Sequence, residues 1–222
     1  MGEAIFIGTL IPLIFLIILL KGENRLLMVF FTWGLLAFAI SLSVNNFLVG
    51  NSFVTIKELS VSWAPVIEEL TKALPLLYFL FTSKDRRIPI VYYGIAAGVG
   101  FAIQENYIYI LQHLGEDQSP ILFILSRCFT SCLIHGITTG MIGYGLMLVR
   151  KLREMVWPML FGLYTLAVTI HALYNLYITT HYQYIGMIMP LVLYLLGYAV
   201  LKINDEPEKE LVLVRTEMEK IN

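Results

Sequence analysis

Residues 63–78 read WAPVIEELTKALPLLY, an apolar stretch with three charged residues near its centre. Glu68, Glu69 and Lys72 would each cost between about 2.5 and more than 10 kcal/mol in the middle of a bilayer, so three together require a reason in the fold. On a helix, Glu68 and Lys72 lie four residues apart on one face, and Glu69 is rotated about 100° away. We therefore expect Lys72 to neutralise Glu68, its partner on that face, while Glu69 points elsewhere. A buried cluster that only holds helices together is the alternative.

The composition of the whole chain indicates that this stretch lies in a membrane. Of its 222 residues, 58% are hydrophobic and 14% are charged, whereas a soluble domain has about 25% charged residues. The apolar residues form runs long enough to cross a hydrocarbon core of about 30 Å as helices. We therefore expect a multi-pass protein of the cell membrane, surrounded by lipid. A net charge of -1 gives no indication of a nucleic-acid partner.

The apolar runs predict an all-α polytopic bundle of about seven transmembrane helices. Basic residues follow the first, third and fifth runs, and Lys57 is the only one in the alternate connections. Because Lys and Arg accumulate on the cytoplasmic side, the N-terminus is expected outside and the C-terminus in the cytosol. Residues 1–203 are expected to form one transmembrane domain, and residues 204–222 a short charged cytosolic tail. The seven runs are Ala4–Leu20, Leu26–Leu48, Ile56–Phe81, Ile88–His113, Pro120–Val149, Met155–Thr180 and Gln183–Leu201.

Few ionisable residues interrupt these runs. Those deep inside are Glu68, Glu69, Lys72, Glu105, Arg127, His135 and His171. Counted at about 1.5 Å per residue, Glu68, Glu105 and the two histidines lie about 12 to 22 Å from the predicted outer ends of four helices. We therefore expect them to meet in one layer in the middle to outer half of the membrane. Arg127 lies nearer the surface, where it either binds a carboxylate or extends to the interface.

Residue spacing indicates which faces meet. His171 and Asn175 are four residues apart, so both project to one side of a helix. Gly94 with Gly98, and Gly136 with Gly140, have the small-xxx-small spacing of membrane helix contacts. The two cysteines, Cys128 and Cys132, are expected to be free packing residues.

Glutamates and histidines at one depth suit cation binding or proton transfer to and from water. A zinc site would take Glu105, His135 and His171 as ligands, with Glu68 or Glu69 as general base. Without a metal, Glu68 would activate water directly, while a histidine and Asn175 stabilise the oxyanion. Both schemes hydrolyse an amide bond within the membrane.

Four ordered motifs identify a family resemblance. They are E-E-x-x-K at Glu68, Glu69 and Lys72, G-F-A-x-x-E-N at Gly100–Asn106, the His135-Gly136 segment, and H-x-x-x-N at His171 and Asn175. Together they resemble the PrsW family of intramembrane proteases, which is similar to the CAAX prenyl proteases and the bacteriocin-processing membrane proteases. The wider group often has E-E-x-x-x-R, whereas residue 73 here is Ala, which favours the PrsW branch.

The resemblance implies a function and a substrate. It implies a protease domain over residues 1–203 and site-1 cleavage of a membrane-anchored anti-sigma factor in stress signalling. Family members are commonly classed as metalloproteases, while CAAX relatives are argued to use glutamate without zinc. Asn106 is expected either to support the site or to be a packing amide. The competing functions are an ion or proton transporter that uses the buried carboxylates as a relay, and a non-catalytic immunity or scaffold protein.

Overall fold

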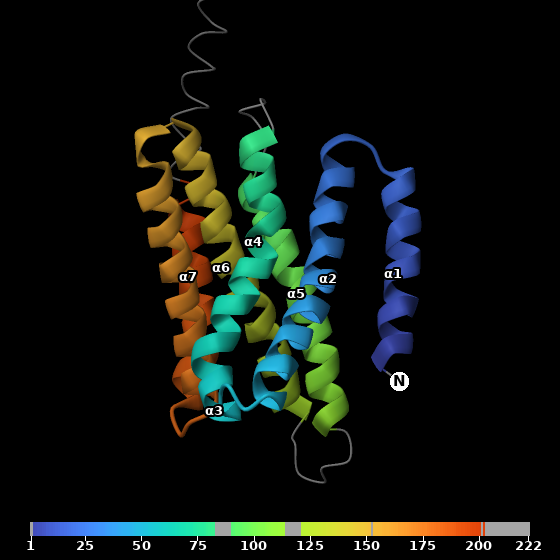
Figure 1. Ribbon diagram of the computed structural model, residues 1–222, viewed down its shortest axis with the longest axis vertical. Helices are drawn as coiled ribbons and strands as arrows, with labels where there is room; N and C mark the ends of the chain where they lie inside the picture. The colour runs from blue at the N-terminus through green and yellow to red at the C-terminus, as the bar shows by residue number, and fades with distance from the viewer. Residues whose placement is uncertain (1, 83–89, 114–120, 152, 201, 203–222) are drawn as a thin grey trace, which may run out of the picture.

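The computed structural model describes residues 2–82, 90–113, 121–151, 153–200 and 202 (Figure 1). All regular structure within these residues is helical, which confirms the all-α class. The elements are α1 (Gly2–Leu19), α2 (Gly22–Gly50), α3 (Ile56–Glu58), the π-helix η1 (Leu59–Trp63), α4 (Ala64–Thr82), α5 (Ile90–His113), α6 (Ile121–Lys151), the 3₁₀ turn η2 (Arg153–Met155) and α7 (Val156–Ile178). A further helix follows at Gln183–Val200.

Each predicted apolar run corresponds to one of these helices, and the third run is divided into α3, η1 and α4. Four segments of the described residues are long and apolar enough to cross a membrane: α2, Leu125–Leu148 within α6, α7 and Gln183–Val200. The chain is therefore a multi-pass membrane protein. The number of seven spans and the orientation of the termini stay predictions, and the predicted tail at 204–222 lies outside the described residues.

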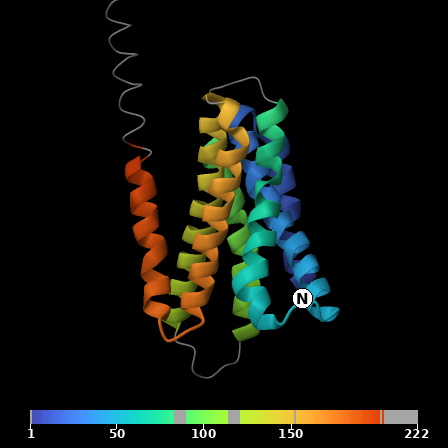
Figure 2. The same cartoon turned by 60° about the vertical axis from the view of Figure 1, so that its left-hand side comes forward.

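The bundle is organised around α5, which packs against α2 on one side and α6 on the other, while α4 contacts α2, α6 and α7. Helix α1 lies at the edge beside α2 (Figures 1 and 2). Gly94 and Gly98 let α5 approach the backbone of α6. A Cβ atom on Gly94 would lie 3.1 Å from the Cα of Gly140, and one on Gly98 would lie 2.8 Å from that of Gly136. The predicted contact through these glycine pairs is confirmed.

An apolar core fills the bundle on one side of the charged turn of α4. Ala73 and Leu76 of α4 pack in this core with Ile90 of α5. The rings of Phe30 and Tyr93 stack at 5.0 Å between α2 and α5. Because Ala73 and Leu76 follow Lys72 directly on α4, the charged turn lies at the edge of the apolar core.

Two prolines flank the charged turn, and each leaves a backbone carbonyl without its helical donor. In η1 the Ala64 N–H donates to the Leu59 carbonyl, so the next bond in this pattern, to Ser60, would come from Pro65, which has no N–H. Asn175 of α7 donates its side-chain amide to the Ser60 carbonyl instead, at 2.9 Å.

Pro75 likewise cannot donate to the carbonyl of Thr71, four residues earlier. The indole N–H of Trp33 on α2 donates to that oxygen at 3.0 Å. The backbone of the charged turn is therefore held by side chains from α2 and α7, and its position depends on the packing of those helices.

Candidate active site

Lys72 pairs with Glu69, not with Glu68. Its Nζ atom lies 2.7 Å from Glu69 Oε1, and both side chains are 0% exposed. The predicted pairing of Lys72 with Glu68 was therefore wrong. On a helix, Lys72 can reach the carboxylate three or four residues before it. The neighbouring helices decide between these two partners, because the polar side chains of α6 and α7 face Glu69.

Glu69 accepts hydrogen bonds from both of these helices. His171 Nδ1 lies 2.9 Å from Glu69 Oε1, and the Thr138 hydroxyl lies 2.8 Å from the same oxygen. The Thr139 hydroxyl lies 3.3 Å from Oε2. With Lys72, four donors of the chain surround this carboxylate. Glu69 is consequently a poor candidate for a base that takes a proton from water.

Lys72 also contacts α6 and α5. Its Nζ atom lies 2.9 Å from His135 Nδ1 and 4.8 Å from the centroid of the Phe101 ring. An ammonium group has three donors, and here they are matched by a carboxylate, an imidazole nitrogen and an aromatic face. This set of contacts compensates the buried charge.

Glu105 of α5 links the histidine to Arg127. Its Oε2 atom lies 3.1 Å from His135 Nε2 and accepts the Ser131 hydroxyl at 2.6 Å. Its Oε1 atom lies 3.4 Å from Arg127 Nη2. Arg127 therefore binds a carboxylate, and its guanidinium also lies over the ring of Tyr109, 4.4 Å from the centroid. Within the described residues, Arg127 Nη1 is buried without a hydrogen-bond partner.

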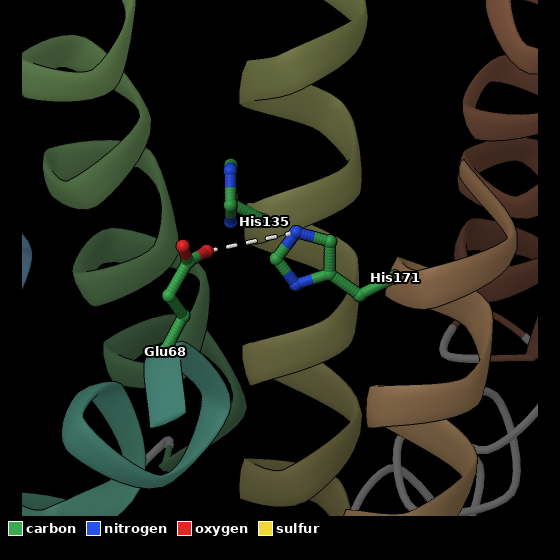
Figure 3. A group of neighbouring side chains, drawn as sticks. All are labelled: Glu68, His135 and His171. Carbon is green, nitrogen blue, oxygen red and sulfur yellow. Dashed lines mark ion pairs between the residues drawn. The ribbon is translucent and has the colours of Figure 1, made fainter. Parts of the chain in front are cut away.

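Glu68 and His171 face each other from α4 and α7 (Figure 3). Glu68 Oε2 lies 3.7 Å from His171 Nε2, beyond hydrogen-bond distance, and the Glu68 side chain is 12% exposed. This oxygen is buried and has no hydrogen-bond partner in the described part of the chain. Glu69 and Glu105 each have a Lys or Arg partner, whereas Glu68 has none among the described residues.

The remaining predicted residues lie around this cluster. Asn175 supports the backbone of η1 through Ser60. Asn106 donates to the Cys128 carbonyl at 3.1 Å and approaches Cys132 Sγ at 3.6 Å, the contacts of a packing amide. Both cysteines are free, as predicted. The structure thus joins Glu68, Glu69, Lys72, Glu105, Arg127, His135 and His171 into one network.

Sequence reasoning missed the hydroxyl groups of α6. Ser131 lies four residues before His135, and Thr138 and Thr139 lie three and four residues after it. On a helix these positions share a face with the histidine. The same spacing argument that grouped His171 with Asn175 would have found them.

Three residues of this network lie close enough together to bind a metal ion. Glu68, His135 and His171 each offer a ligand atom, all within 4.8 Å of one another. The predicted ligand set had Glu105 in place of Glu68. The set has the composition of a catalytic zinc site, which takes three protein ligands.

The hydrogen bonds of His135 conflict with this role. The Lys72 ammonium can only donate, so His135 Nδ1 accepts a hydrogen bond from it and Nε2 carries the ring hydrogen toward Glu105. Glu68 and His171 alone then present free lone pairs, and two ligands are fewer than a catalytic zinc site requires. In this arrangement the residues do not fit a three-ligand metal centre unless His135 leaves Lys72.

Comparison with known proteins agrees with the motifs. A model of the family described as PrsW family intramembrane metalloprotease matches residues 22–202, which include the whole network. Comparisons with curated proteins and with solved structures find no match. The matched range covers most of the 222 residues and contains the four apolar helices long enough to cross a membrane. The chain therefore belongs to the PrsW family of intramembrane metalloproteases.

Proposed function

We propose that this protein is an endopeptidase of the cell membrane in which Glu68 and His171 activate the attacking water. Family membership supports a membrane protease. The observation that carries the assignment to these two residues is the buried Glu68 Oε2 atom, which has no hydrogen-bond partner among the described residues and lies 3.7 Å from His171 Nε2.

Two hydrogen-bond acceptors face each other here. His171 donates its Nδ1–H to the Glu69 carboxylate, so its Nε2 atom carries a lone pair toward Glu68. Two acceptors at this distance need a shared donor, and a water molecule can donate one hydrogen to each. Such a water is held and polarised by a base on either side.

The reaction follows from this placement. The water oxygen bonds to the carbonyl carbon of the scissile amide as Glu68 takes its proton. The C–N bond then breaks, and the proton on Glu68 passes to the departing amine, which restores the carboxylate. Glu69 keeps His171 oriented, and the His135–Glu105 pair borders the same space, since the two histidine rings lie 4.7 Å apart.

The negative charge on the tetrahedral oxygen needs a donor. Asn175, the predicted donor, uses its amide on the Ser60 carbonyl. Arg127 Nη1 is a buried donor without a partner in the described residues, and Glu105 connects it to His135. We assign the stabilisation of the oxyanion to Arg127, since donors that meet their partner only in the transition state accelerate the chemical step.

The substrate is proposed to be a protein with a membrane span. A transmembrane helix uses its carbonyls in its own hydrogen bonds, so the substrate must unwind locally before attack. From the resemblance, we propose that the substrate is an anti-sigma factor cleaved at site 1 in stress signalling. Co-expression with a tagged anti-sigma factor, followed by mapping of the fragments, tests this substrate separately from the chemistry.

The chemistry is tested with purified protein in lipid vesicles that contain a single-span substrate. Glu68→Gln and His171→Gln should abolish cleavage, while Glu154→Gln, at an exposed position in η2, should retain it. Full activity of Glu68→Gln would refute the proposal. Ion flux through the vesicles without cleavage would support the transporter, and a loss of thermal stability alone would support the scaffold.

Elemental analysis beside cleavage with and without a chelator separates the two mechanisms. Activity that persists in metal-free protein supports water activation by Glu68. Stoichiometric zinc that the chelator removes together with activity would mean that His135 gives up its contact with Lys72. The same variants then report the ligands, because loss of a ligand lowers the zinc content.

A further inference from the structure

We infer that the Glu69–Lys72 ion pair sets opposite tautomers in the two histidines of the site. His135 carries its hydrogen on Nε2, and His171 carries its hydrogen on Nδ1. The pair thereby makes one imidazole a donor and the other an acceptor within the same cluster. This assigns Glu69 and Lys72 as positioning residues, distinct from Glu68 beside them.

The tautomer of His135 follows from Lys72. The ammonium group lies 2.9 Å from His135 Nδ1 and has no lone pair, so Nδ1 must accept. A neutral imidazole with a free Nδ1 carries its hydrogen on Nε2, which lies 3.1 Å from the Glu105 carboxylate. A hydrogen on His135 Nδ1 would point at the Lys72 ammonium. This excludes both the imidazolium and the tautomer that is protonated on Nδ1.

The tautomer of His171 follows from Glu69. An ionised carboxylate only accepts hydrogen bonds, and Lys72 at 2.7 Å favours the ionised form of Glu69. His171 Nδ1, 2.9 Å from the same oxygen, therefore carries the hydrogen. In the neutral ring, Nε2 is then left with a lone pair toward Glu68.

One ion pair reaches both histidines because of its spacing and burial. Glu69 and Lys72 are three residues apart on α4, which faces α6 and α7. Both side chains are 0% exposed, so water does not compete with the histidines for them. The His135 and His171 rings meet edge to face, with an interplanar angle of 85°. Each ring therefore receives its own partner from one turn of α4.

The consequence for catalysis rests on the proposed function, whereas the tautomer assignments rest only on the hydrogen bonds of the two histidines. His171 can accept a proton from water or bind a cation through Nε2. His135 can do neither while Lys72 and Glu105 hold it. The E-E-x-x-K motif thus combines one reactive carboxylate with the pair that orients both histidines.

The wild-type protein provides the first test. The chain has four histidines, so ¹⁵N-histidine labelling in lipid nanodiscs gives few resonances. His113→Asn with His181→Asn leaves only the two rings of the site. Protonated and unprotonated ring nitrogens resonate far apart, so each tautomer is read directly. We expect one ring of each tautomer; two rings in the same tautomer, or an imidazolium, would overturn the inference.

A double variant tests the cause. Glu69→Gln with Lys72→Met removes both charges together, so no buried charge is left unpaired. We expect the His135 signal to lose its single tautomer and cleavage to fall by about 10- to 100-fold, the usual effect of losing a partner that orients an active-site histidine. Lys57→Met, at an exposed position, is the matched control and should change neither.

The two proposals fail in different ways. Unchanged tautomers in the folded double variant would overturn the role of the ion pair, even if cleavage fell. Should the double variant not fold, the wild-type spectrum still decides the tautomers. The predicted tautomers in a protein that cleaves no substrate would uphold the inference and refute the proposed function.

Discussion

Replacement of Gly98 by alanine should separate two helices that share the site. The new methyl group would lie 2.8 Å from the Cα of Gly136, against 3.4 Å at the start of ordinary van der Waals contact, and it would meet the His135 carbonyl even more closely. Both obstacles are backbone atoms, which no side-chain rotation removes. Helices α5 and α6 must therefore move apart.

The site depends on the distance between those helices. Glu105 on α5 bonds His135 on α6 at 3.1 Å and Ser131 at 2.6 Å, so a separation of the two helices lengthens both contacts. Overpacking costs about 1–3 kcal/mol, and the higher helix propensity of alanine offsets about 1 kcal/mol of this. A displacement of about 1 Å at a reactive group can reduce the rate about 100-fold.

We therefore expect Gly98→Ala to fold with a modest loss of thermal stability and a large loss of cleavage. The assay is cleavage of a single-span substrate in vesicles beside thermal unfolding in detergent. Gly162→Ala is the matched control, because a Cβ atom there meets nothing within 4 Å. Gly98→Ala with wild-type activity would refute the reasoning that the α5–α6 contact positions the Glu105–His135 pair.

Four further predictions follow from single contacts. Ser131→Ala should lower the free energy of unfolding by about 1.5–3 kcal/mol, the contribution of a hydrogen bond to a charged group. Equilibrium unfolding measures this against the control Ser43→Ala on the exposed side of α2. Equal stability of the two variants would contradict the prediction. Asn175→Ala should increase hydrogen exchange at residues 59–63, because the Ser60 carbonyl loses its donor; unchanged exchange would show that η1 does not need α7. Arg127→Gln should lower kcat about 100- to 1000-fold with KM little changed. The control Arg25→Gln, at an exposed position, should match the wild type. A change confined to KM would show that Arg127 does not act in the chemical step. The Thr55 backbone N–H and hydroxyl hold the pKa of Glu58 below its usual value, so the stabilisation of α3 is present above that usual value and is lost as pH falls through the folded pKa. The protection factors of the Glu58 and Leu59 amides against hydrogen exchange should fall at acid pH in the wild type, and a Glu58→Gln protein with the same pH response would contradict this.

Much of the fold was predictable because its signals are local. The length of an apolar run and the absence of charge within it decide whether a helix can cross a bilayer, and each predicted run became a helix. The glycine pairs were also predictable, since their spacing places them on one face and only glycine permits backbone contact. Arg127 remained open between two roles, because both depend on a neighbour that lies far away in the sequence.

By itself, the sequence determined the class of protein and marked the ionisable residues that the structure brings into one network. Charged side chains inside apolar runs cost so much free energy that they mark the site without any knowledge of the packing. Helical spacing also restricted the possible partners of Lys72 to residues three and four positions away.

Only the tertiary structure decided which partner Lys72 takes and which groups each histidine contacts. The rotation of α4 relative to α6 and α7 turns Glu69 toward Thr138, Thr139 and His171. It leaves Glu68 beside His171, with one oxygen that has no hydrogen-bond partner in the described part of the chain. That rotation is fixed by side chains of distant helices, which donate hydrogen bonds to the carbonyls that Pro65 and Pro75 leave without donors. Hydrogen bonds across a helix bundle require a distance and a direction, and a linear sequence specifies neither until the helices have packed.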